Sequence, residues 1–116
     1  MARSNRDRGW PNSPPLSKPK YESKYHLINQ EIHQRRVVHS FTMGDVEDVD
    51  IYIAFPISEW QETEKGAWVM KHGLDPVYNV MPDPVSFGYK VVITAMISER
   101  RWTEYALRFI DSLSKL

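Results

Sequence analysis

The sequence predicts an α+β domain, in which one main helix at about 57–72 packs on a small antiparallel sheet of three to four strands. Two segments predict the sheet, because apolar and polar residues alternate at 35–43 and at 87–97. A capped pattern with helical spacing predicts the helix. With 116 residues and no cysteine, the chain has room for one domain, held by packing rather than by disulfides. The expected strands are at about 35–43, 77–81, 87–97 and 102–110.

The first 20 residues form a basic arm that cannot build a core. The stretch PNSPPLSKPK, at 11–20, holds four of the chain's eight prolines. Trp10 and Leu16 are the arm's only large apolar residues apart from the initial methionine. So few apolar side chains cannot repay the entropy of ordering the backbone. We therefore expect residues 1–20 to be disordered or extended.

A short amphipathic helix is expected at 21–34, between the arm and the domain. Four apolar residues follow one another at spacings of four, three and four, which places them on one helical face: Tyr21, Tyr25, Ile28 and Ile32. Such a helix packs either on its own domain or in the groove of a partner. The compact domain then comprises residues 35–116.

The strand at 35–43 is expected to be half-buried. Its alternation places Val37 on the same face as His39 and Phe41, with Val38 on the opposite face.

The main helix is expected to lie between an acidic bend and a glycine. In the bend GDVEDVD, at 44–50, Asp48 or Asp50 can cap a first helical turn through Tyr52 and Ala54, ahead of the main helix. Ser58 and Gln61 have the spacing of a capping box, and Gly73 is a natural C-cap. Gly66 costs about 1 kcal/mol relative to alanine inside a helix, which a close approach of helix to sheet would explain.

The strand at 87–97 is expected to be central, because both of its faces are rather apolar. The strand at 77–81 is short and is bounded by prolines. The last segment alternates like a strand at 102–110, but it also fits a helix that Ser98 would cap. Propensity favours a helix, whereas a strand would give the central strand an antiparallel neighbour without a crossover. We expect the strand.

A net charge of zero hides an asymmetry along the chain. Residues 1–40 hold eight basic and three acidic residues, a net charge of +5. Residues 41–116 hold seven basic and twelve acidic residues, a net charge of −5. Basic arms commonly meet phosphate or an acidic protein surface. The arm can also fold back onto its own acidic domain, where its effective concentration is high.

These features predict a non-enzymatic interaction or assembly protein that docks through its N-terminal arm. The partner is a larger protein assembly, such as a multi-subunit particle, or another copy of the chain. Trp10 is the best single anchor, because no intrinsic core surrounds it. Proline also reduces the entropy that the arm loses on docking. The expected partner-binding residues are Trp10, Pro14, Pro15, Lys18, Lys20, Tyr21, Tyr25, Ile28 and Ile32.

Nucleic acid is the alternative partner. The arm mixes cationic and aromatic residues, a composition that suits phosphate contacts combined with base stacking. The acidic domain and the lack of an RNP-like motif argue against it. The expected contacts in this case are Arg3, Arg6, Arg8, Lys18, Lys20 and Lys24.

A small enzyme with an acidic metal site is the third hypothesis. Four carboxylates of the bend could hold Mg²⁺ or Ca²⁺: Asp45, Glu47, Asp48 and Asp50. They lack the spacing of an EF-hand, and capping a helix is the more ordinary role for them. The histidines lack metal-ligand spacing, and no nucleophile or phosphate-binding motif occurs. We expect no cofactor.

Neither a signal peptide nor a membrane span is expected. The longest apolar runs have about five residues, as at 51–55, whereas a membrane helix needs about 20. No apolar region follows the N-terminal arginines. We expect the protein in the cytoplasm, elsewhere inside a cell or in a virion.

Overall fold

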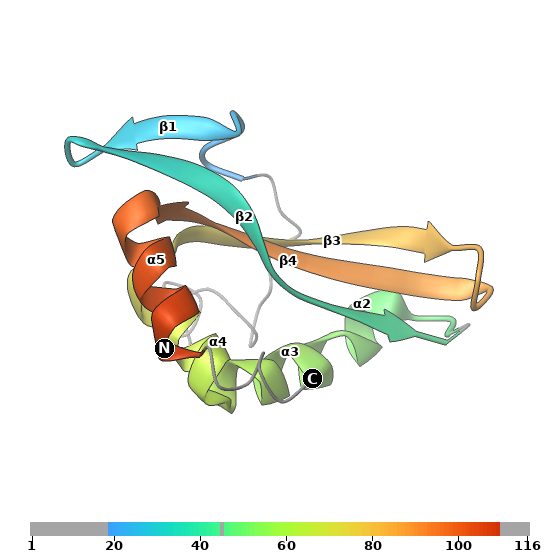
Figure 1. The fold of residues 1–116 in the computed structure, drawn as a ribbon. Helices are drawn as coiled ribbons and strands as arrows, with labels where there is room; N and C mark the ends of the chain where they lie inside the picture. Colours follow the sequence, from blue (N-terminus) through green and yellow to red (C-terminus); the bar gives the residue numbers. More distant parts are fainter. Residues whose placement is uncertain (1–18, 45, 110–116) are drawn as a thin grey trace, which may run out of the picture.

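The computed structural model describes residues 19–44 and 46–109, without the side chain of Asp50. One four-stranded antiparallel sheet and the helices beside it form an α+β fold, as the sequence predicts. Figure 1 shows the sheet as a curved layer, with the helices α3 (Ala54–Glu62) and α4 (Glu64–His72) on one of its faces and α5 (Glu99–Arg108) at one end.

The strands are β1 (Tyr25–Ile28), β2 (Glu31–Met43), β3 (Leu74–Asp83) and β4 (Gly88–Ser98). Their order in the sheet is β1-β2-β4-β3, and neighbouring strands are antiparallel. β4 is therefore central, as its apolar composition predicts. β3 is an edge strand, which explains why it extends through Pro76 and Pro82, beyond the predicted 77–81.

The helix expected at 21–34 is wrong, because this segment forms the β1–β2 hairpin. Asn29 and Gln30 make its two-residue turn, with φ angles of 52° and 67°. Two successive positive φ angles give the tight turn that matches the twist of a hairpin. Leu27 and Ile32 are direct cross-strand partners, a contact that the predicted helix would not make.

The strand expected at 102–110 is also wrong, because the segment forms α5 (Glu99–Arg108). Ser98 caps this helix, and its hydroxyl accepts a hydrogen bond from the backbone N–H of Arg101 at 3.2 Å. Trp102 and Tyr105 then stack and pack against the core. This cap and these contacts favour the helix over a fifth strand.

The helix expected at 57–72 is divided into α3 (Ala54–Glu62) and α4 (Glu64–His72). Thr63 separates them with an extended ψ of 163°. Its hydroxyl donates to the carbonyl of Trp60 and accepts from the N–H of Gly66, so it joins the end of α3 to the start of α4.

One of the two predicted caps of this helix is confirmed. Ser58 lies inside α3, so the capping box is wrong, whereas Gly73 is the C-cap of α4 as predicted. Gly66 allows a close approach to α3 rather than to the sheet. A Cβ at this position would lie 1.8 Å from the carbonyl oxygen of Trp60.

A shift of register between Val37 and His39 changes the faces of β2. Val37 is exposed and pairs with Thr94, whereas Val38 packs against the core. The predicted alternation therefore fails at Val37 and Val38 and holds from His39 onward. Figure 1 shows that β2 is curved along its length.

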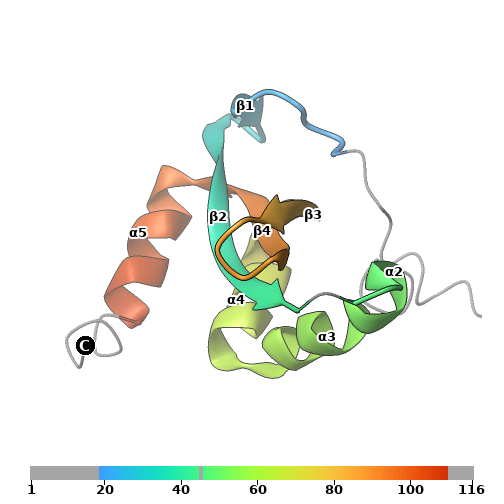
Figure 2. The same cartoon turned by 90° about the vertical axis from the view of Figure 1, so that its right-hand side faces the viewer.

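The core lies between the sheet and the helices. A buried cluster joins the C-cap of α2 (Val49–Tyr52) to α3, α4, β3, β4 and the residue after α5, and side chains of β2 pack against it. Its members are Ile53, Ile57, Trp60, Trp68, Val69, Tyr78, Val91, Ile93, Ala95, Ile97 and Phe109. The face of the sheet away from the helices is covered in part by residues 19–24 (Figure 2).

Candidate interaction site

Residues 19–24 are fastened to the sheet by an ion pair between β2 and β3. Arg35 Nη2 lies 2.6 Å from Asp75 Oδ2, and the two side chains are 15% and 11% exposed. Nη1 also donates to the main-chain oxygen of Asp75 and to Thr94 Oγ1, each at 3.1 Å. Three acceptors of the domain itself thus hold the two terminal nitrogens of the guanidinium.

The Asp75 carboxylate in turn holds the incoming backbone. Its Oδ1 accepts the N–H of Lys20 at 3.0 Å, and its Oδ2 accepts the N–H of Tyr21 at 2.8 Å. Arg35 Nη2 donates to the carbonyl of Tyr21 at 3.2 Å, and the N–H of Arg35 donates to the carbonyl of Lys24. We call these groups of Arg35 and Asp75 the clamp. It fixes the direction in which the chain enters β1.

Beyond the clamp, the hairpin presents three large apolar side chains on one face. Leu27 and Ile32 are Cα partners, and Tyr25 lies two residues before Leu27 on the same strand, so all three point to the same side. Tyr25 is 56% exposed, Leu27 67% and Ile32 59%. We call these three residues the hairpin patch.

The hairpin patch lies on the helix side of the sheet but beyond the helices. Ile32, Gln34 and Arg36 follow one another on this face of β2. The guanidinium carbon of Arg36 lies 5.0 Å from the centroid of the Trp102 ring in α5. Figure 1 shows the turn of the hairpin extending past α5. The hairpin is joined to α5 near that turn by the exposed Glu31–Arg100 pair, at 3.1 Å.

The opposite face of the hairpin is better covered. His26 and Ile28 lie on this side with His33, which is 7% exposed. The rings of Tyr21 and His26 meet edge to face at 4.8 Å between centroids. Tyr21 and Ile28 therefore do not share a face with Tyr25 and Ile32, contrary to the helical prediction.

The predicted partner-binding residues thus separate into four groups, one of which is Ile28 alone on the opposite face of the hairpin. Tyr25 and Ile32 lie in the hairpin patch, and Lys20 and Tyr21 lie at the clamp. Seven residues proposed for partner or nucleic-acid contacts lie outside the described residues: Arg3, Arg6, Arg8, Trp10, Pro14, Pro15 and Lys18. Sequence reasoning missed Leu27, which a period of two from Tyr25 would have indicated.

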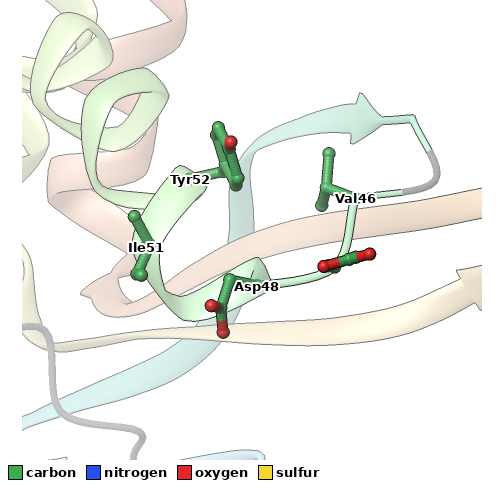
Figure 3. A pocket seen from close by; sticks show the side chains of 5 residues that line it. Val46, Asp48, Ile51 and Tyr52 are labelled. Carbon is green, nitrogen blue, oxygen red and sulfur yellow. The ribbon is translucent and has the colours of Figure 1, made fainter.

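The acidic bend lies at the other end of the molecule from the hairpin turn. Val46, Glu47, Asp48, Ile51 and Tyr52 line an open hollow of about 390 Å³, shown in Figure 3. Asp48 is the N-cap of α2, but its side chain makes no capping hydrogen bond. Among the described residues, no group of three potential ligands could hold a metal ion. Asp45 and the side chain of Asp50 lie outside this description.

A second hollow, of about 370 Å³, lies between β2, the α3–α4 junction and α5. Its walls include His39, Lys65 and Tyr105, and the ring of His39 stacks on Trp60 at 5.5 Å. Burial, and to a smaller degree the charge of Lys65, lowers the pKa of His39 below 6.5. Burial likewise raises the pKa of Tyr105. Both groups are therefore uncharged at neutral pH.

In the described ranges, no helix has the length and apolar character needed to cross a membrane. Comparisons with protein-family models, with curated proteins and with solved structures found no match.

Proposed function

We propose that this chain is a non-enzymatic interaction subunit, which docks on a larger protein assembly through the hairpin patch and the N-terminal residues before it. One observation carries this proposal. Three large apolar side chains, each more than half exposed, lie together on one face of a projecting hairpin. Contiguous exposed apolar surface is typical of sites that bind another protein.

The clamp supports the proposal because it presents the patch in one orientation. Five hydrogen bonds join the Arg35 and Asp75 side chains to residues 20–21, to Thr94 and to the main chain of Asp75, in addition to the ion pair. A surface that is ordered before binding loses less entropy when a partner docks. The basic residues before the clamp would then extend the contact along the partner.

Nucleic acid is a second candidate partner, favoured by one observation. Lys20 Nζ lies 5.5 Å from the centroid of the Tyr21 ring, and Lys24 Nζ lies 5.7 Å from that of Tyr25. Cations beside aromatic rings are suited to phosphate contacts next to stacked bases.

Capture from an extract of the cells that make the protein tests the two candidates. We expect Tyr25→Ser/Leu27→Ser/Ile32→Ser to lose proteins that the wild type retains at high salt. Val85→Ser/Phe87→Ser is the matched control, because these residues at the β3–β4 turn are 87% and 85% exposed. If both variants retain the same proteins, the hairpin patch is not the docking surface.

The salt dependence separates protein from nucleic acid. Binding through phosphate falls steeply with salt, because each neutralised phosphate releases counterions. If the captured material is nucleic acid that is released as salt rises, and Lys20→Gln/Lys24→Gln lowers the slope, the second candidate replaces the first.

A further inference from the structure

We infer that β1 also pairs with β1 of a second copy, antiparallel and about a two-fold axis at His26. The two four-stranded sheets would then join edge to edge. This inference rests on the proposed function to the extent that the same hairpin is the interaction surface. It adds the identity of one partner, a second copy of this chain, and the register of the contact.

The hydrogen bonds of the hairpin show which groups of β1 are free. The N–H of Arg35 donates to the carbonyl of Lys24, so Lys24 and Arg35 form a hydrogen-bonded pair. Such pairs alternate along an antiparallel ladder, so His26 and Ile28 also direct their backbone groups toward β2. Tyr25 and Leu27 therefore direct their N–H and C=O groups toward the open edge. Within the described part of the chain, no hydrogen bond reaches these four groups.

This edge is complementary to itself. With His26 facing His26 of the second copy, Tyr25 of each copy lies opposite Leu27 of the other. Each of these two pairs exchanges two backbone hydrogen bonds, which satisfies all four free groups of both strands. Centring the axis on Tyr25 or Leu27 instead would pair one of these residues with a position outside β1. The two-fold axis at His26 is thus the register that uses the whole strand.

The side chains agree with this register. Tyr25 lies opposite Leu27 of the second copy, and Leu27 has Ile32 as its partner within the hairpin. The hairpin patches of both copies would therefore join into one apolar surface, and aromatic–aliphatic cross-strand pairs stabilise sheets.

The other edge of the sheet is protected in the usual ways. β3 contains Pro76 and Pro82, which lack the donors that a neighbouring strand needs. Its register on β4 is also interrupted between Leu74 and Val77. β1 has neither proline nor register shift, so it is the edge of this sheet that accepts a further strand.

A cysteine at the proposed axis tests the register directly. The sequence has no cysteine, so an introduced thiol has no competitor. Position 26 would face its own copy in a non-hydrogen-bonded pair, where Cα atoms are about 4.5 Å apart and a disulfide fits. We expect His26→Cys to become mostly covalent dimer under mild oxidation.

Leu27→Cys is the matched control on the same strand. It is more exposed than position 26, but it would lie diagonal to itself, about 7–8 Å away, too far for a disulfide. We expect it to cross-link little alone, and to cross-link with Tyr25→Cys when the two variants are mixed. Equal cross-linking of His26→Cys and Leu27→Cys alone would overturn the register.

Light scattering on the wild-type chain gives an independent measurement. We expect the mass to rise from 13.6 kDa toward twice that value as the concentration increases. Leu27→Pro removes an outward donor and leaves the hydrogen bonds of the hairpin, so it should weaken the dimer at least tenfold with an unchanged circular dichroism spectrum. A single mass of 13.6 kDa at every concentration, with no cross-link at position 26, overturns the inference.

Docking through the hairpin patch and self-pairing of β1 can be refuted independently of each other. If the serine variant of the hairpin patch loses a captured protein while His26→Cys stays monomeric, self-pairing is wrong and docking stands. If His26→Cys cross-links and no other protein depends on the patch, the second copy is the whole partner and docking on a larger assembly is wrong.

Discussion

The clamp makes a quantitative prediction for Asp75→Asn. Asp75 has a positive φ of 51°, a conformation that asparagine also tolerates, so the substitution removes the charge without adding backbone strain. It leaves the Arg35 guanidinium largely buried beside a neutral amide. The same change replaces one of the two carboxylate oxygens that hold the backbone of Lys20 and Tyr21.

The size of the effect follows from burial. Removing one partner of a fully buried ion pair costs about 3–5 kcal/mol. Here the side chains keep 15% and 11% of their exposure, and the asparagine keeps one acceptor oxygen. We therefore expect the free energy of unfolding to fall by about 3 kcal/mol, at the lower end of that range.

Urea denaturation and amide hydrogen exchange measure the two parts of this prediction. The free energy of unfolding should fall as stated, and the amides of Lys20 and Tyr21 should exchange at least tenfold faster. Glu104→Gln is the control, because it breaks an exposed pair with Arg101 on α5 and should leave both measurements unchanged. If Asp75→Asn behaves like Glu104→Gln, the clamp does not hold the N-terminal segment.

Three further predictions concern the body of the domain. Since burial lowers the pKa of His39 below 6.5, the folded state binds fewer protons than the unfolded chain near pH 6; stability should fall as the pH drops below about 6.5, and urea titrations of His39→Gln should show a smaller fall. Gly66→Ala should destabilise by about 1–3 kcal/mol in thermal or urea unfolding, although helix propensity alone would favour alanine, because the new Cβ would meet the carbonyl of Trp60; Gly44→Ala, with nothing within 4 Å, should not. Ser98→Ala should cost about 1 kcal/mol by removing the cap of α5, and an unchanged midpoint would contradict that role.

The sequence predicts the fold class and the central strand because their patterns are long. β4 has apolar residues on both faces over Gly88–Ser98, which only a central strand can bury. The predicted bounds of the helices are wrong, in contrast. Thr63 divides the predicted helix by bonding locally to Trp60 and Gly66 at once, and the spacing of apolar residues alone does not show this interruption.

The prediction for 21–34 is wrong because the same residues fit both the period of a helix and the period of a strand. Tyr25, Ile28 and Ile32 suit a helix, whereas Tyr25, Leu27 and Ile32 suit a hairpin. The decision rests on the left-handed turn at Asn29 and Gln30, and only the first of these residues favours such a turn from sequence. The clamp could not be predicted, because Arg35 and Asp75 are far apart in the chain and meet only through β4.

Site-specific photo-cross-linking in the producing cells tests the central claim, that the hairpin patch is the surface that binds protein. A benzoylphenylalanine at position 25 replaces one exposed aromatic residue by another, and position 87, at the far β3–β4 turn, is the control. We predict discrete protein adducts at position 25 that position 87 does not give. Adducts at position 87 and none at position 25 would contradict the account.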